Sequence, residues 1–177
     1  VQDCLDNNER GDGVLFAALH RGKFLCNKSK KDKPWMMWAG HHWINDHVDE
    51  SVRGVEAVAM RYLSMAETIQ DEIKELRSQL KAIESKMAGD KAAEEADSAS
   101  EAQAKQLNAQ IGQLVERRKA IKRRVDRLRS WPGANKCLNW AHCIENPLAI
   151  VGDDVYLRNG VWVELRARPF GRITRAG

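Results

Sequence analysis

The chain of 177 residues has no long apolar run and none of the common nucleotide-hydrolysis or hydrolase motifs. No segment approaches 18 consecutive apolar residues, so we expect no helix that crosses a membrane. The patterns G-x-x-x-x-G-K-[ST], G-x-S-x-G and H-E-x-x-H are absent, which argues against ATP hydrolysis and against these hydrolase mechanisms. The chain starts at Val1 with no basic-then-apolar leader, so we expect a piece of a longer, cytoplasmic protein.

Cysteine is scarce and forms no C-x-x-C pair. An even count of four is compatible with two disulfides, but nothing else indicates secretion, so we expect reduced thiols at Cys4, Cys26, Cys137 and Cys143. Zinc favours four S or N ligands presented in close pairs, whereas Cys137 and Cys143 would lie about 240° apart around a helix. We therefore expect no metal and no cofactor. The alternative is a zinc site at Cys137, His142 and Cys143, or one at His41, His42 and His47.

Carboxylates that could hold catalytic metal ions are also not clustered. The only adjacent aspartates are Asp153 and Asp154, which precede an expected hairpin and fit a turn. We therefore expect no catalytic residues and no enzyme activity in this chain. A fragment of a metal-dependent nuclease or primase is the alternative, and it would have to contain bound metal.

Charge is distributed unevenly although the formal net charge is only +4. Residues 90–101 are acidic, residues 117–129 hold eight Lys or Arg against one Asp, and residues from 155 onward hold five Arg against one Glu. The basic surface is therefore expected to be local.

Short elements are predicted at both ends of the chain. Residues 11–22 read as a helix that Asp12 can cap and Gly22 can end, and 23–27 as a strand. Residues 35–38 and 41–44 read as a strand pair around Ala39-Gly40. Trp131-Pro132-Gly133 should stop a preceding helix, with a short helix at 135–145. The alternation of 155–158 and 161–165 around Asn159-Gly160 predicts a second hairpin.

The middle of the chain carries two heptad stretches. The first seam is Tyr62, Ala66, Ile69, Ile73, Leu76, Leu80, Ile83 and Met87, and the second is Ala104, Leu107, Ile111, Leu114, Arg118, Ile121, Val125 and Leu128. Only Arg118 interrupts them, and we expect its guanidinium to reach outward to an acid of the other helix. The small, acidic break between the stretches favours an antiparallel helical hairpin, with a parallel dimeric coiled coil as the alternative.

Together these elements predict an α+β fold that is mainly α: a small Trp-rich β-hairpin and a C-terminal β-hairpin with a long antiparallel helical arm. The expected organisation is one domain fragment. Residues 11–47 form its first helix and Trp-rich hairpin, 48–130 its arm, and 131–177 a short helix and the C-terminal hairpin.

The order of these parts resembles the phage and plasmid primase–helicases, specifically the poxvirus-type primase N-terminal-like domain that precedes their superfamily-3 helicase. The resemblance lies in Leu15-Phe16-Ala17, then the pattern W-x-x-W-x-G-x-x-W at Trp35, Trp38, Gly40 and Trp43, followed by Asp46 and a long helix. Near the end it continues with 158–161 (RNGV) and 173–175 (ITR), although the family's Thr-Gly turn is absent.

The resemblance implies a role in DNA replication inside a bacterial host cell, with primase and helicase domains as covalent neighbours. It also implies that this domain makes no bonds itself, because the chemistry belongs to those neighbours. We therefore expect a linker or assembly domain. The alternative is an unrelated coiled-coil module that dimerises or recruits a protein.

Contact with single-stranded or duplex DNA is a further expectation, with residues taken from three basic stretches: Lys28, Lys30, Lys31, Lys33, Arg117, Lys119, Lys122, Arg123, Arg124, Arg127, Arg166 and Arg168. A solvated face neutralised by Glu67, Asp71, Glu72 and Glu75 of the opposite helix is the other interpretation of the middle stretch. The hairpin tryptophans could stack on bases, but the period of two favours Trp35, Met37 and Trp43 as the core of the sheet.

Overall fold

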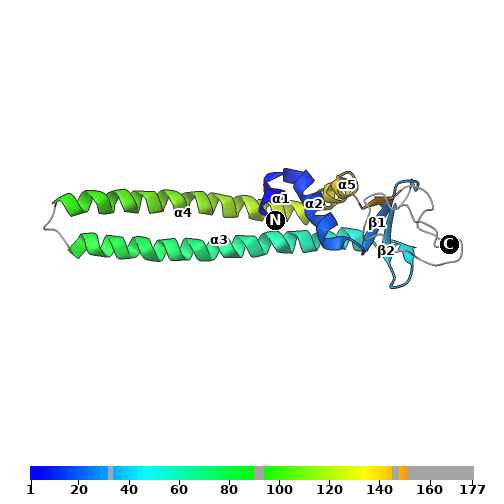
Figure 1. Cartoon of the computed structure of the whole chain (residues 1–177), viewed down its shortest axis with the longest axis horizontal. Helices are drawn as coiled ribbons and strands as arrows, with labels where there is room; N and C mark the ends of the chain where they lie inside the picture. Colours follow the sequence, from blue (N-terminus) through cyan, green and yellow to red (C-terminus); the bar gives the residue numbers. More distant parts are fainter. Residues whose placement is uncertain (32–33, 90–93, 145–147, 151–177) are drawn as a thin grey trace, which may run out of the picture. The chain divides into compact units, whose positions relative to one another are not determined.

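The computed structural model describes residues 1–31, 34–89, 94–144 and 148–150, and it divides the chain into two compact units (Figure 1). Unit 1 comprises Val1–Arg61 and Asp126–Gly177, and unit 2 comprises Tyr62–Val125. Helices dominate and accompany one small sheet, which confirms the mainly α, α+β class. In the described part of the chain no helix is long and apolar enough to cross a membrane. The expected hairpin at 155–165 lies outside the described residues.

Two helices open unit 1, α1 (Gln2–Asp6) and α2 (Asn8–His20). Asp12 lies inside α2 and is buried, so the prediction that Asp12 caps this helix was wrong. Two glycines inside α2 lie where it contacts other helices: a Cβ on Gly11 would overlap the Cys4 carbonyl, and one on Gly13 would overlap Trp140. They allow α2 to pack closely. Gly22, with φ of 82°, follows the helix end as expected.

The sheet has the strand order β3-β2-β1-β4. Strands β1 (Phe24–Asn27), β2 (Trp35–Trp38) and β3 (Trp43–Asn45) are antiparallel, and β4 (Ala149–Ile150) adds a short parallel edge to β1. The strand predicted at 35–38 is confirmed. The one predicted at 41–44 begins later because Gly40, with φ of 94°, and His41 form a tight turn closed by a hydrogen bond from Ala39 N to His42 O (2.9 Å).

The strand register places the tryptophans on opposite faces of the sheet. Met36 pairs with Leu25, and Trp38 pairs with Trp43; these four form one cluster, in which Met36 is fully buried. Because side chains alternate along a strand, Trp35 and Met37 point to the other face. The prediction that Trp35, Met37 and Trp43 share one buried face was therefore wrong.

The second face of the sheet packs against α2. The ring of Phe16 lies 6.0 Å from the rings of both Phe24 and Trp35, and His20 lies 5.3 Å from Phe24. All of Phe16, Phe24 and Cys26 are buried. Both faces of this small sheet therefore carry apolar side chains, which explains why a simple alternation of buried and exposed residues does not describe it.

Helix α5 (Trp131–Ala141) starts four residues earlier than the helix predicted at 135–145. Ser130 caps it by accepting a hydrogen bond from Gly133 N (3.3 Å), and Pro132 occupies its first turn, where a missing N–H costs nothing. Pro132 therefore belongs to the start of α5. The preceding helix has already ended at Leu128.

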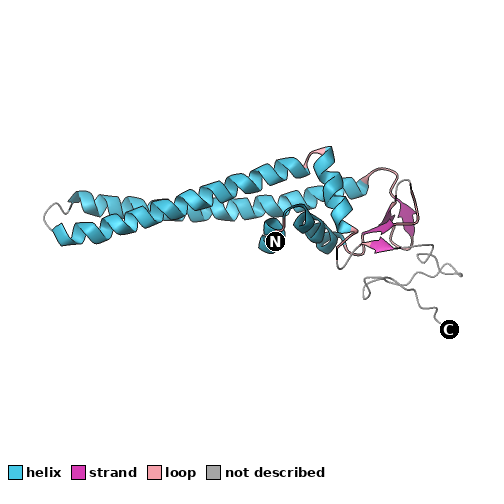
Figure 2. Cartoon of the chain, turned by 90° about the horizontal axis from the view of Figure 1, so that it is seen from above, coloured by secondary structure: helices cyan, strands magenta, loops and turns pink. Residues whose placement is uncertain are grey.

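Unit 2 is formed by parts of α3 (Glu50–Gly89) and α4 (Glu94–Leu128), which run side by side in opposite directions (Figures 1 and 2). This is the predicted antiparallel pairing. The buried heptad positions within unit 2 are Tyr62, Ala66, Ile69, Ile73, Leu107, Ile111, Ile121 and Val125. From Leu76 onward the described seam positions of α3 are half-buried, so the tightest packing lies in the half of this unit that contains Tyr62 and Val125.

Candidate nucleic-acid interface

Four cations of the predicted basic stretch are exposed on one part of α4 within unit 2. Arg117, Lys119, Lys122 and Arg123 are all exposed to solvent. Lys119 and Arg123 are one helical turn apart and therefore share a face, with Lys122 beside them. This cationic face (Arg117, Lys119, Lys122 and Arg123) can attract phosphates by charge.

Two other arginines of the same stretch are turned inward. Arg124 is 6% exposed, so its side chain offers little surface to the DNA contact predicted for it. Its position at the edge of the packed seam explains the burial. Arg118 lies in the seam as predicted, but its Nε is buried and has no hydrogen-bond partner among the described residues. Its guanidinium is therefore only partly solvated.

Acidic neighbours neutralise only part of the cationic face. Lys119 donates to Glu116 on its own helix (2.7 Å), and this hydrogen bond lowers the pKa of the Glu116 carboxyl. On α3, Asp71 pairs with Lys74 (2.8 Å) and Glu75 accepts from Gln79 (3.2 Å). These contacts run along each helix. Such exposed pairs are weak because water screens them, so a ligand can compete for Lys119.

The basic loop after β1 is partly used to hold unit 1 together. Lys30 Nζ donates to Asn45 Oδ1 of β3 (2.6 Å), and Lys28 Nζ lies 3.4 Å from His142 Nε2. Lys31 is exposed. Arg127, also in unit 1, is exposed as well. The remaining predicted contacts, Lys33, Arg166 and Arg168, lie outside the described residues.

The tryptophans of the hairpin are not the ones that face solvent. Trp43 is 6% exposed, and Trp35 and Trp38 are half-buried. In contrast, Trp131 is 63% exposed at the start of α5, and Trp140 is 39% exposed. Sequence reasoning missed both. Ser130-Trp131-Pro132 marks the start of a helix and so places Trp131 in its first turn, but no local pattern indicates that either side chain is exposed.

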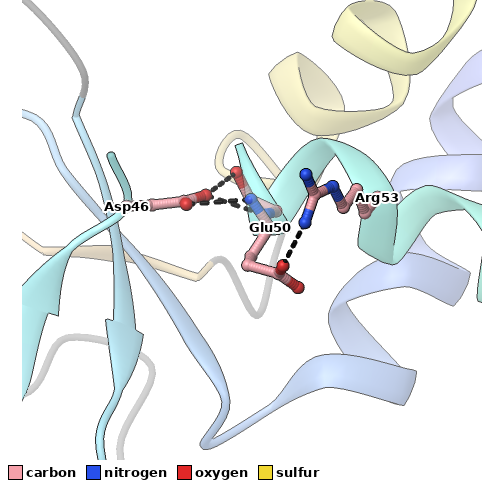
Figure 3. Close-up of polar contacts among 4 residues, drawn as sticks. Asp46, Glu50 and Arg53 are labelled. Carbon is pink, nitrogen blue, oxygen red and sulfur yellow. Dashed lines mark hydrogen bonds and ion pairs between the residues drawn. The ribbon is translucent and has the colours of Figure 1, made fainter. Parts of the chain in front are cut away.

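Asp46 joins the sheet of unit 1 to the first turn of α3 (Figure 3). Its carboxylate accepts hydrogen bonds from Glu50 N (2.8 Å), Ser51 N (2.7 Å) and Ser51 Oγ (2.6 Å). Burial alone would raise the pKa of this carboxyl, but the hydrogen bonds from Ser51 and Glu50 outweigh it and keep the pKa below 3.8. A negative charge at a helix N-terminus is favourable, so Asp46 is a structural anchor.

His20 of α2 makes a second contact with the first turns of α3. Its Nε2 lies 2.8 Å from the Gly54 carbonyl oxygen of α3, and its ring lies 4.5 Å from Phe16. Burial lowers the pKa of His20 below 6.5, the bond to Gly54 opposes this change, and the Lys23 charge adds to it. His20 is therefore mainly neutral near pH 7, as expected for a histidine inside an aromatic cluster.

A second histidine lies beside a cysteine after α5. Cys143 Sγ is 3.0 Å from His142 Nδ1, and burial together with the Lys28 charge lowers the pKa of His142. Burial raises the pKa of the nearby Cys26 thiol to about 11. Within the described ranges, no three His, Cys, Asp or Glu side chains are grouped as metal ligands, and the four cysteines are free thiols.

Comparison with family models, curated proteins and solved structures finds no match to this chain. The functional proposal therefore draws on the sequence and the geometry of the chain itself. The described surfaces offer a cationic helix face in unit 2 and exposed aromatic rings in unit 1. Both are suited to binding and neither presents a nucleophile with a base and an oxyanion site.

Proposed function

We propose that this chain is a non-catalytic linker or assembly domain of a phage or plasmid DNA primase–helicase, and that it contacts DNA. The replication context rests on the motif order described above, from Trp35 to Asp46 and on to a long helix. The β2–β3 hairpin and α3 follow one another in the same order, which supports that comparison.

The observation that carries the DNA contact is the cationic face of α4. Arg117, Lys119, Lys122 and Arg123 fall within two turns of one helix and are all exposed. Clustered cations of this kind displace the counterions of DNA, which makes binding favourable and sensitive to salt. A face used only for solubility would more often mix both signs.

The alternative is a coiled-coil module that dimerises through the arm. Every large apolar side chain that is strongly exposed in the described residues lies in unit 1, and only two of these, Val48 and Met60, belong to the arm: Val1, Val14, Val48, Met60, Trp131 and Trp140. A dimer interface through unit 2 would need an apolar stripe on its surface. The exposure pattern therefore favours the DNA-contacting domain over the dimerisation module.

Fluorescence anisotropy with a labelled duplex at several salt concentrations tests the proposal. We expect the affinity to fall steeply with salt, and the double variant Lys122→Glu/Arg123→Glu to weaken binding and reduce the log–log salt slope by about two. Arg77→Glu/Lys81→Glu is the matched control, because it makes the same charge change at exposed positions of α3 in unit 2.

Equal losses in the two double variants would show that only net charge matters, and the assignment to α4 would fail. Binding that does not respond to salt would contradict a phosphate contact altogether. Circular dichroism of each variant checks that the helices are intact, since all four substituted side chains are exposed.

A further inference from the structure

A small groove lies in unit 1 between the first turns of α3 and the start of α5. Its volume is about 340 Å³, near the lower end of ligand pockets, which span about 300 to 1,000 Å³. It therefore has room for one nucleotide-sized group. Its lining combines apolar and charged side chains: Val52, Arg53, Val55, Glu56, Leu128, Arg129, Ser130, Trp131 and Ala134.

The aromatic wall of the groove is unusually accessible. Trp131 is 63% exposed, more than any other tryptophan in the described residues. Ser130 caps α5 through Gly133 N and Pro132 restricts the first turn, so the backbone that carries Trp131 is well defined. Its largely uncovered indole offers a flat surface on which a base can stack.

Both arginines of the groove have an acidic partner, and they differ in the donors that stay open. Arg129 is engaged by Glu56 through two hydrogen bonds, Nη2 to Oε1 (2.6 Å) and Nε to Oε2 (3.1 Å). Arg53 donates to Glu50 through one terminal nitrogen only (2.6 Å), and its side chain is 69% exposed. The other terminal nitrogen points away from Glu50 (Figure 3), where it can donate to a phosphate oxygen.

We propose that this groove binds one nucleotide of a single strand, with its base on Trp131 and its phosphate at Arg53. This inference rests on the proposed function, because its ligand is a nucleic acid, and it adds a preference for single-stranded over duplex DNA. Residues 63–130 contain no Phe, Tyr or Trp, so the cationic face of α4 offers charge for phosphates but no aromatic ring for bases. Stacking requires an unpaired base, and the groove provides the aromatic surface for it.

Anisotropy with a fluorescein-labelled oligothymidylate tests this assignment. We expect Trp131→Ala to weaken binding about fivefold to a hundredfold, the range found for losing one stacked base, and Trp131→Phe to retain most of it. Arg53→Gln should also weaken it. The matched controls are Trp140→Ala, at the other exposed tryptophan of α5, and Arg61→Gln, at an exposed arginine of α3 in the same unit.

The outcomes separate this inference from the proposed function. If the oligothymidylate binds, depends on Lys122 and Arg123, and is unaffected by Trp131→Ala, the groove assignment is wrong and the DNA contact stands. If neither this probe nor a duplex binds the unmodified chain, both fail. Displacement of the probe by a poly-glutamate peptide at equal charge would show an anion site without base recognition, and would overturn the assignment to a nucleotide.

Discussion

Asp46 connects β3 to α3 through a single carboxylate, and the loss of stability when this carboxylate is removed can be predicted. It is 3% exposed and accepts three hydrogen bonds from Glu50 and Ser51. Asp46→Ala leaves these donors without partners, so we expect the free energy of unfolding to fall by about 1 to 3 kcal/mol. Urea denaturation followed by circular dichroism measures this change.

The control for Asp46 is Asp71→Ala, which removes an exposed carboxylate paired only with Lys74. We expect that variant to stay within about 0.5 kcal/mol of the unmodified chain. Equal effects at the two sites would show that the buried cap contributes no more than a surface charge. Asp46→Asn should give an intermediate loss, because the amide keeps one acceptor.

Two histidines, the buried His20 and the half-buried His142, predict how stability depends on pH. Burial lowers the pKa of both His20 and His142 in the folded chain, so the unfolded chain binds protons more readily at these positions. The contribution of these groups to stability is therefore fully present above about pH 6.5 and is lost as the pH falls below that value. We expect the urea midpoint to decrease between about pH 7 and pH 5.

His20→Gln should flatten this dependence, and His41→Gln, which makes the same change at an exposed position, is the matched control. The glutamine can still donate to the Gly54 carbonyl, which His20 contacts at 2.8 Å. A pH profile that is unchanged in His20→Gln would contradict the assignment of the slope to this histidine.

At the scale of single elements, the arm illustrates what periodicity predicts well. Its seam was predictable because heptad spacing is a property of the chain itself, and Ile73 and Ile121 are fully buried as it requires. The spacing did not predict that Leu80 would be only half-buried. The extent of burial depends on how closely two helices approach, which no single stretch encodes.

This difference along the seam gives an element-scale prediction. Ile73 is 1% exposed, so Ile73→Ala should reduce the free energy of unfolding by about 2 to 5 kcal/mol. Leu80→Ala removes a side chain of similar size from a half-buried position and should cost clearly less. Thermal melts followed at a helix wavelength compare the two variants. Equal losses would contradict a seam that loosens beyond Ile73.

The sheet shows where local reasoning stops. The strand at 35–38 was predictable from alternation and Gly40, but which face Trp43 occupies depends on its pairing with Trp38, and hence on the length of the turn. Likewise Gly11 and Gly13 resemble breakers in sequence, although they lie inside α2 because Cys4 and Trp140 pack against them. Such tertiary contacts are not visible in a local pattern.

At the scale of the whole molecule, the candidate site was only partly predictable. The exposed cations of 117–123 follow from composition, but the inward position of Arg124 required the three-dimensional packing. The groove at Trp131 combines residues from α3 and α5 that are far apart in the chain, and no motif links them. Sites of this kind arise from the fold alone.

The self-contained pairing of α3 with α4 also predicts the molar mass in solution. A hairpin that closes within one chain should give the mass of one chain by light scattering at every concentration. Leu76→Asp, at a half-buried seam position, should lower the melting temperature and leave the mass unchanged. A concentration-dependent dimer that Leu76→Asp abolishes would instead support the coiled-coil module.

The division into two units has a spectroscopic consequence. All six tryptophans fall in the part of the sequence assigned to unit 1, whereas most of the helical residues belong to α3 and α4. Intrinsic emission therefore reports on the sheet and its surroundings, and far-ultraviolet ellipticity is dominated by the arm. Recording both signals during one urea titration reveals, without any label, whether the surroundings of the tryptophans or the long helices unfold first.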